Sequence, residues 1–185
     1  MPSSRQNSNI HVNLVLFQSV WFLTVIAAAN GSWWPGLAGL GVFIAVHCFV
    51  SPTARADFLL VICALLIGLV CETIFIRTGM LVYSVPGISE AGSSIAGVPV
   101  WILVLWANFA LIMNGCLAWL RGRYVLAAVL GFAGAPLSYF GGIKLGAALP
   151  GESLFIAMLA IASCYAVITP LLIFLAQWLS KTRPA

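Results

Sequence analysis

One apolar run dominates this sequence: Phe58-Leu-Leu-Val-Ile-Cys-Ala-Leu-Leu-Ile-Gly-Leu-Val-Cys-Glu72-Thr-Ile-Phe-Ile76. It contains one charged side chain, Glu72, and comes close to the roughly 20 apolar residues that a helix needs to cross a bilayer. The rest of the chain has the same character, since 63% of its 185 residues are hydrophobic, 6% are charged and the mean hydropathy is +1.12. Soluble domains average about 25% charged residues. The composition therefore excludes a soluble enzyme and a nucleic-acid-binding module.

Other stretches of the chain meet the same criterion of length and composition. They cover residues 12–29, 34–50, 99–120, 124–144 and 153–179. We expect an all-α integral membrane protein, a bundle of six transmembrane helices with an N-terminal tail (1–10), one domain (11–180) and a C-terminal tail (181–185). The first stretch is expected to stay in place rather than to be removed as a signal peptide, because Asn13 and Gln18 dilute its apolar core.

The distribution of Lys and Arg predicts the orientation of this bundle. With a cytoplasmic N-terminus, the inner side carries Arg5, Arg55, Arg121, Arg123, Lys181 and Arg183. The outer side then carries only Arg77 and Lys144. Because cytoplasmic loops are enriched in Lys and Arg, we expect both termini to be cytoplasmic.

Glu72 is the main candidate for a functional residue. It falls about four residues from the outer end of its predicted helix, roughly 6 Å below the interface. A carboxylate is costly in hydrocarbon, so it is expected to be paired, hydrated or protonated. We expect Lys144 to be its counter-charge, because the helix before Lys144 ends on the same side. Glu72 then lines an outward-facing cavity or serves as a structural hydrogen-bond anchor, and both interpretations are open. Gly68, one turn away, predicts that this face meets another helix.

Polar and small residues elsewhere predict contacts between helices. Side-chain amides often hold membrane helices together, and we expect this of Asn13, Gln18, Asn108 and Asn114. The stripe Ala127, Gly131 and Ala135 allows another helix to approach closely, either within the chain, in a homo-oligomer or in another membrane protein. The polar loop 79–98 is expected to cover an outer cavity. Cofactor motifs and the usual metal-ligand patterns are missing from the sequence, so no cofactor, metal or nucleic acid is expected.

Several runs resemble those of a known family. They are Asn13-Leu-Val-Leu-Phe-Gln18 with Trp21, Gly68-Leu-Val-Cys-Glu72, Val98-Pro-Val-Trp101 with Trp106, and Gly131-Phe-Ala-Gly-Ala-Pro136-Leu-Ser-Tyr139. Together they are similar to a family of small bacterial inner-membrane proteins that is known only as a domain of unknown function. The resemblance implies a multi-pass protein of the bacterial inner membrane. Genes of this family often lie beside cyclopropane-fatty-acid-synthase-like genes, which implies a role connected with membrane lipids.

Three functions are compatible with these observations. In the first, the protein binds or helps to process a membrane lipid or acyl chain in an outward-facing cavity between helices. The candidate residues for that site are Glu72, Lys144, Tyr139, Trp101, Trp106, Asn108 and Gln18. In the second, it is a small proton-linked transporter in which Glu72 takes and releases the proton. In the third, it is a structural subunit or partner of another membrane protein.

Overall fold

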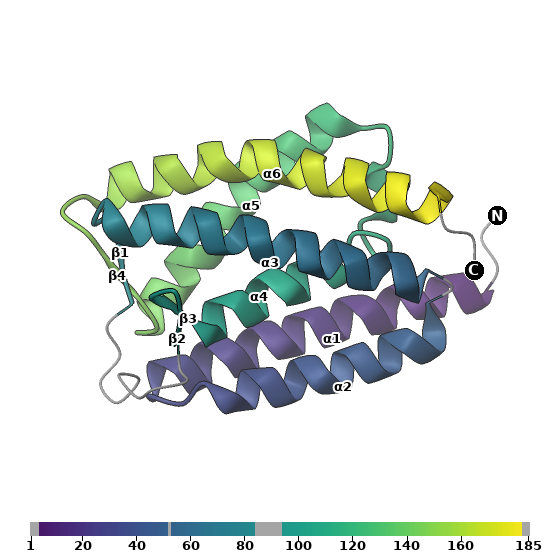
Figure 1. Cartoon of the computed structure of the whole chain (residues 1–185), viewed down its shortest axis with the longest axis horizontal. Coiled ribbons are helices and arrows are strands. Elements are labelled where there is room, and N and C mark those ends of the chain that lie inside the picture. The colour runs from purple at the N-terminus through teal and green to yellow at the C-terminus, as the bar shows by residue number, and fades with distance from the viewer. Residues whose placement is uncertain (1–3, 52, 84–93, 183–185) are drawn as a thin grey trace.

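The apolar stretches form helices, and the protein is all-α. The computed structural model describes residues 4–51, 53–83 and 94–182. The α-helices are α1 (Ser4–Ala29), α2 (Trp34–Val50), α3 (Ala54–Arg77), α4 (Val100–Leu111), α5 (Tyr124–Lys144) and α6 (Leu154–Thr182), with one 3-10 turn, η1 (Ala118–Leu120) (Figure 1). The start of α1 and the end of α6 lie at one end of the bundle, which we call the terminal end.

Four helical segments are long and apolar enough to cross a membrane. They are Ile10–Ala29, Ala54–Arg77, Tyr124–Lys144 and Leu154–Lys181. The apolar parts of the other two helices, Trp34–Phe49 and Val100–Leu111, are shorter. The length and composition of the four long helices are those of a membrane protein. The number of crossings and the side on which each terminus lies stay predictions.

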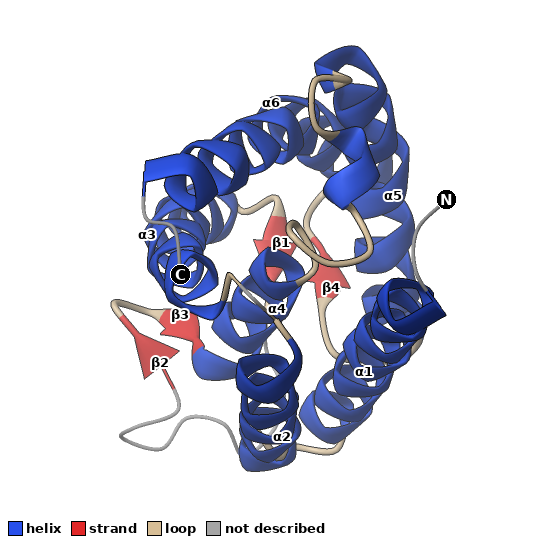
Figure 2. Cartoon of the chain, turned by 90° about the vertical axis from the view of Figure 1, so that its right-hand side faces the viewer, coloured by secondary structure: helices blue, strands red, loops and turns tan. Residues whose placement is uncertain are grey.

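Helix α4 lies in the middle of the bundle. Viewed end-on, α1, α2, α3, α5 and α6 surround it (Figure 2). It is hydrophobic on all sides, and nearly all of its residues are buried, from Trp101 near its start to Leu111 at its end. A helix with this composition is stable only when other helices cover its whole circumference. Helix α4 is therefore the core element of the fold.

The prediction of one continuous helix over 99–120 is wrong in its second half. Helix α4 ends at Leu111, and its 12 residues extend over only about 18 Å. Turns follow, and Asn13 of α1 completes the hydrogen bonding of their backbone. Its side chain accepts a bond from the Cys116 N–H (3.1 Å) and donates one to the Leu111 carbonyl (3.4 Å). Irregular backbone is tolerated inside a membrane bundle where protein groups bond it in this way.

Short strands close the other end of the bundle, which we call the strand end. Strand β1 (Leu81–Val82) pairs with β4 (Leu149–Pro150), and β2 (Ser94–Ile95) pairs with β3 (Val98–Pro99), both antiparallel. The β2–β3 hairpin turns through Ala96 and Gly97, both with positive φ, as the tight hairpin turns require. The described parts of the predicted loop 79–98 thus contain β1, β2 and the first residue of β3.

The small-residue stripe of α5 is used within the chain. Ala127 and Gly131 are buried. A Cβ atom at Gly131 would collide with the Tyr165 carbonyl and the Thr169 side chain of α6. Of the open alternatives for this stripe, the structure shows packing between α5 and α6. Its two innermost residues are consequently not available to a second copy or to another protein.

Candidate functional site

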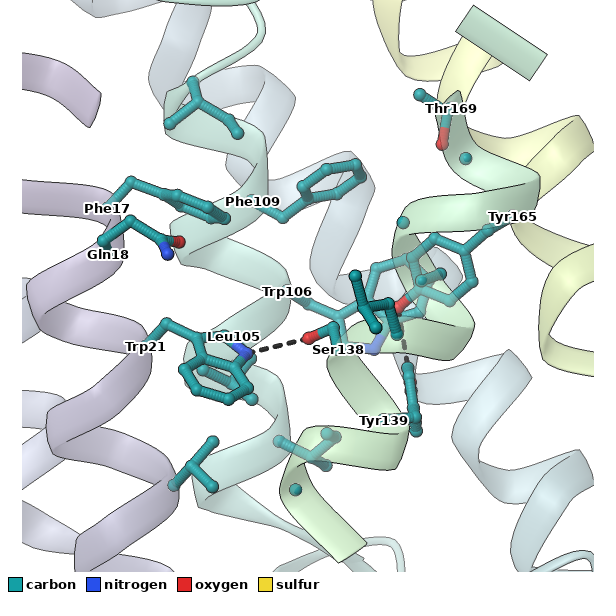
Figure 3. Close-up of a pocket in the computed structure, with 18 of the residues that line it drawn as sticks. Phe17, Gln18, Trp21, Leu105, Trp106, Phe109, Ser138, Tyr139, Tyr165 and Thr169 are labelled. Carbon is teal, nitrogen blue, oxygen red and sulfur yellow. Dashed lines mark hydrogen bonds between the residues drawn. The ribbon is translucent and has the colours of Figure 1, made fainter. Parts of the chain in front are cut away.

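A cavity of about 530 Å³ lies among α1, α4, α5 and α6. Figure 3 shows its middle, where the rings of Trp106, Tyr139 and Tyr165 form one wall. Tyr83 and Trp101 line it toward the strand end. Toward the terminal end its lining includes Ile112, Leu117, Leu120 and Leu130. This is the size and composition of a small-molecule site, mostly apolar with a few polar groups.

The cavity reaches the outer surface of the bundle between α1 and α5. Two of its lining residues, Phe22 of α1 and Leu137 of α5, are 49% and 73% exposed. Trp21 crosses this opening, and its indole N–H donates a hydrogen bond of 2.8 Å to Ser138 Oγ (Figure 3). Apart from the exposed amide of Gln18, the exposed residues of the lining here are apolar, so the opening faces the region that lipid would occupy in a membrane.

Glu72 lies directly behind the aromatic wall and is fully buried. Three groups donate hydrogen bonds to its carboxyl oxygens. They are Tyr83 Oη to Oε2 (2.6 Å), Trp106 Nε1 to Oε1 (3.0 Å) and Tyr139 Oη to Oε1. All three donors also line the cavity. Glu72 therefore fixes the orientation of the wall without itself lining the cavity.

The wall continues through a second tyrosine. Tyr165 Oη lies 3.3 Å from Tyr139 Oη, and since the single hydroxyl proton of Tyr139 is given to Glu72, Tyr165 is the donor of this bond. The ring of Tyr165 also stacks on Trp106, with centroids 5.1 Å apart. At the strand end, burial raises the pKa of the Tyr83 phenol well above its ordinary value, so this donor keeps its proton.

The structure brings most of the predicted site residues together. Gln18, Trp101, Trp106 and Tyr139 line the cavity, and Glu72 is bonded to its wall. Asn108 is fully buried outside it and donates a bond of 3.0 Å to the Phe17 carbonyl. It connects α4 to α1, as expected for an amide between membrane helices.

Lys144 is not the counter-charge of Glu72. Its ammonium group lies over the ring of Phe140, 5.3 Å from the centroid, on an exposed part of α5. Within residues 4–51, 53–83 and 94–182 the one ion pair joins His47 and Asp57. The prediction failed because it assumed that a buried acid needs an opposite charge, whereas three neutral donors complete the bonding of this one.

Two residues of the cavity lining each contain a polar atom without a hydrogen-bond partner within the described part of the chain. They are Trp101 Nε1 and Thr169 Oγ1, and neither atom has accessible surface toward the cavity. More than 90% of buried polar groups in proteins have a partner, so such exceptions need an explanation. An indole N–H can only donate, which means that its missing partner is an acceptor.

The residue pattern did not reveal two tyrosines of the cavity lining, Tyr83 and Tyr165. Tyr83 falls in a polar loop and Tyr165 in the middle of an apolar helix, where an aromatic residue is usually core. The available signal was their hydroxyl group, since a buried tyrosine usually finds a hydrogen-bond partner.

A second buried acid, Asp57, was also missed, because it falls between the predicted stretches 34–50 and 58–76 rather than inside one of them. His47 bonds its Oδ2 at 2.8 Å, Ser51 at 3.0 Å and Thr53 at 2.9 Å, while Asn114 donates to Oδ1. Arg121 donates in turn to Asn114. Ser51 bonds Asp57 rather than His47, so this is not the arrangement of a serine hydrolase. The cluster fastens the start of α3 to the end of α2 and to the turns after α4.

Comparison with known proteins gives a family and no more specific relative. The family model described as "Protein of unknown function (DUF2878)" matches residues 10–171. No curated protein and no solved structure matches the chain. The matched region contains every described residue of the cavity lining, and Glu72 as well. The chain therefore belongs to the DUF2878 family, a family of unknown function.

Proposed function

We propose that this protein binds a membrane lipid or acyl chain in the cavity among α1, α4, α5 and α6, in the bacterial inner membrane. One observation carries the proposal. The cavity is lined mostly by apolar and aromatic side chains with a few neutral polar groups, and it opens between α1 and α5 beside the exposed apolar residues Phe22 and Leu137. This lining matches the hydrocarbon chain and the neutral polar group of an amphiphile.

The access route also supports a lipid rather than a water-soluble ligand. The residues at the opening, such as Phe22 and Leu137, present hydrocarbon to their surroundings. A ligand arriving from water would have to cross that surface, whereas a lipid already lies beside it. The four long apolar helices support this route, because their length and composition suit them to a lipid bilayer.

Two glycines offer a matched test. A Cβ atom at Gly142, a buried residue of the cavity lining, would have no other atom within 4 Å, so its free space is the space of the cavity. Gly41 has the same free space on the exposed face of α2, away from the cavity. Gly142→Phe is expected to fill the cavity, and Gly41→Phe is the control for the change of residue.

The measurement is native mass spectrometry of protein taken from bilayers of phosphatidylethanolamine, monoacylglycerol and polyprenol. Wild type and Gly41→Phe are expected to retain a lipid adduct, and Gly142→Phe is expected to lose it. The absence of an adduct on wild type, or equal retention by both variants, would contradict the proposal.

A further inference from the structure

The lining of the cavity carries no charge among the residues that the structure describes. Six cationic side chains are described, and none of them lines it: Arg55, Arg77, Arg121, Arg123, Lys144 and Lys181. The nearest acid, Glu72, lies behind the wall and is bonded to Tyr83, Tyr139 and Trp106. The wall thus offers nothing that would neutralise a phosphate or a carboxylate.

An anionic group inside this cavity would be unfavourable in either protonation state of Glu72. If Glu72 is ionised, it repels the anion across one layer of aromatic rings. If Glu72 is protonated, the anion lies in an apolar space without a partner. Buried charges in proteins are paired or bound to cations, and this cavity provides neither arrangement.

The hydrogen-bonding groups of the lining narrow the ligand further. The donors of Tyr83, Tyr139 and Trp106 are used by Glu72, and that of Trp21 is used by Ser138. Trp101 Nε1 is left without a protein acceptor among the described residues, on a side chain that is only 2% exposed. This nitrogen has almost no accessible surface, so it does not face the cavity and offers no hydrogen bond to a ligand there.

We infer that the ligand is an uncharged amphiphile, because the lining pairs no charge and the indole and phenol donors beside Glu72 are already used. Phosphorylated and carboxylate lipids are excluded from the interior of the cavity. This inference rests on the proposed function and specifies its class of ligand: neutral glycerides and isoprenoid alcohols belong to it, whereas phospholipids and free fatty acids do not.

A matched pair of probes tests the inference. 1-Monooleoylglycerol and its phosphate ester, 1-oleoyl-lysophosphatidic acid, have the same chain and glycerol and differ only in the charged group. The two are added in equal amounts to the purified full-length protein, and the occupancy of each is read by native mass spectrometry. We expect the neutral lipid to exceed the phosphate ester by at least about tenfold, because only the ester brings an unpaired charge.

The outcomes separate this inference from the proposed function. Equal occupancy by both probes would overturn the inference and leave lipid binding intact, because the charged group would then stay outside the cavity. If the protein retained neither probe, the inference and the proposed function would both be overturned.

Discussion

Gly68 of α3 lies directly against the indole of Trp106 in α4. A Cβ atom at position 68 would be 2.5 Å from Cγ and Cδ2 of that ring. The same indole donates a hydrogen bond to Glu72, one turn further along α3. The missing side chain at position 68 is thus what allows α4 to come close enough for this bond, and the prediction that the face of Gly68 meets another helix is confirmed.

Gly68→Ala is expected to destabilise the protein by about 1–3 kcal/mol, the usual effect of adding a methyl group to a filled core. Trp106 can move away from α3 only by giving up its hydrogen bond to Glu72 and its stacking on Tyr165. Thermal unfolding in detergent measures the change. Gly41→Ala is the control, since a Cβ atom there meets nothing, and it should be neutral or slightly stabilising. Equal stability of the two variants would contradict the close packing of α3 on α4.

Replacing Glu72 removes one acceptor from three buried donors at once. Glu72→Ala is expected to lower the free energy of unfolding by about 3 kcal/mol or more, because each unpaired donor costs about 1–3 kcal/mol. Tyr139→Phe removes a single donor and should cost about 1 kcal/mol. Glu152→Gln, on an exposed acid, is the control and should change nothing measurable. Chemical unfolding of the three variants gives the comparison.

Substitutions of Glu72 also distinguish the three candidate functions from one another. A proton-linked transporter requires that Glu72→Gln abolish uptake in proteoliposomes while the protein stays folded. A purely structural subunit requires that changes at Glu72 affect stability alone. If the protein binds lipid, a change at Glu72 that disorders Trp106 and Tyr139 also lowers the occupancy of the cavity by lipid.

Asn13→Ala is expected to destabilise the protein by about 1–2 kcal/mol, because it leaves the Cys116 N–H without its acceptor. Hydrogen exchange should also rise in the turns between Leu111 and Ala118, where the backbone depends on this side chain. Asn30→Ala is a suitable control, since that exposed amide bonds only a carbonyl within its own helix. Unchanged exchange after the Asn13 substitution would contradict its role in holding the end of α4.

The raised pKa of Tyr83 predicts how stability depends on pH. The folded state holds the phenol proton more tightly than the unfolded state, so its contribution is complete below the ordinary tyrosine pKa of about 10 and decreases as the pH rises above it. The unfolding temperature of wild type should therefore fall more steeply above about pH 10 than that of Tyr83→Phe. Parallel curves for the two proteins would show that Tyr83 is not buried.

Most of the helix positions follow from the sequence, because a bilayer imposes a minimum length on every apolar crossing. The predicted 34–50 coincides with α2, and the predicted 58–76 lies inside α3. The prediction of one continuous helix over 99–120 failed because it rested on hydropathy alone. Hydropathy reports where a segment is buried but not whether its backbone is helical, and the Asn13 side chain that completes the turns after Leu111 comes from a distant part of the chain.

The sequence indicates which types of residue form the site but not which of them form hydrogen bonds with one another. An intramembrane acid, tryptophans and Tyr139 were recognisable because polar atoms are rare and costly in lipid. Which donor meets Glu72 depends on rotations about the helix axes that the sequence does not encode locally. Lys144 shows this, since it lies on the expected side but turns toward Phe140.

The early stop of α4 also constrains the order in which the chain is assembled. A helix of 12 residues is too short to be recognised as a membrane crossing alone, and the turns after it leave polar backbone groups that oil cannot bond. Their partner Asn13 belongs to α1, which precedes α4 along the chain. The turns after α4 consequently complete their hydrogen bonding only when α1 is in place, so the earlier helix serves as the template on which the central one matures.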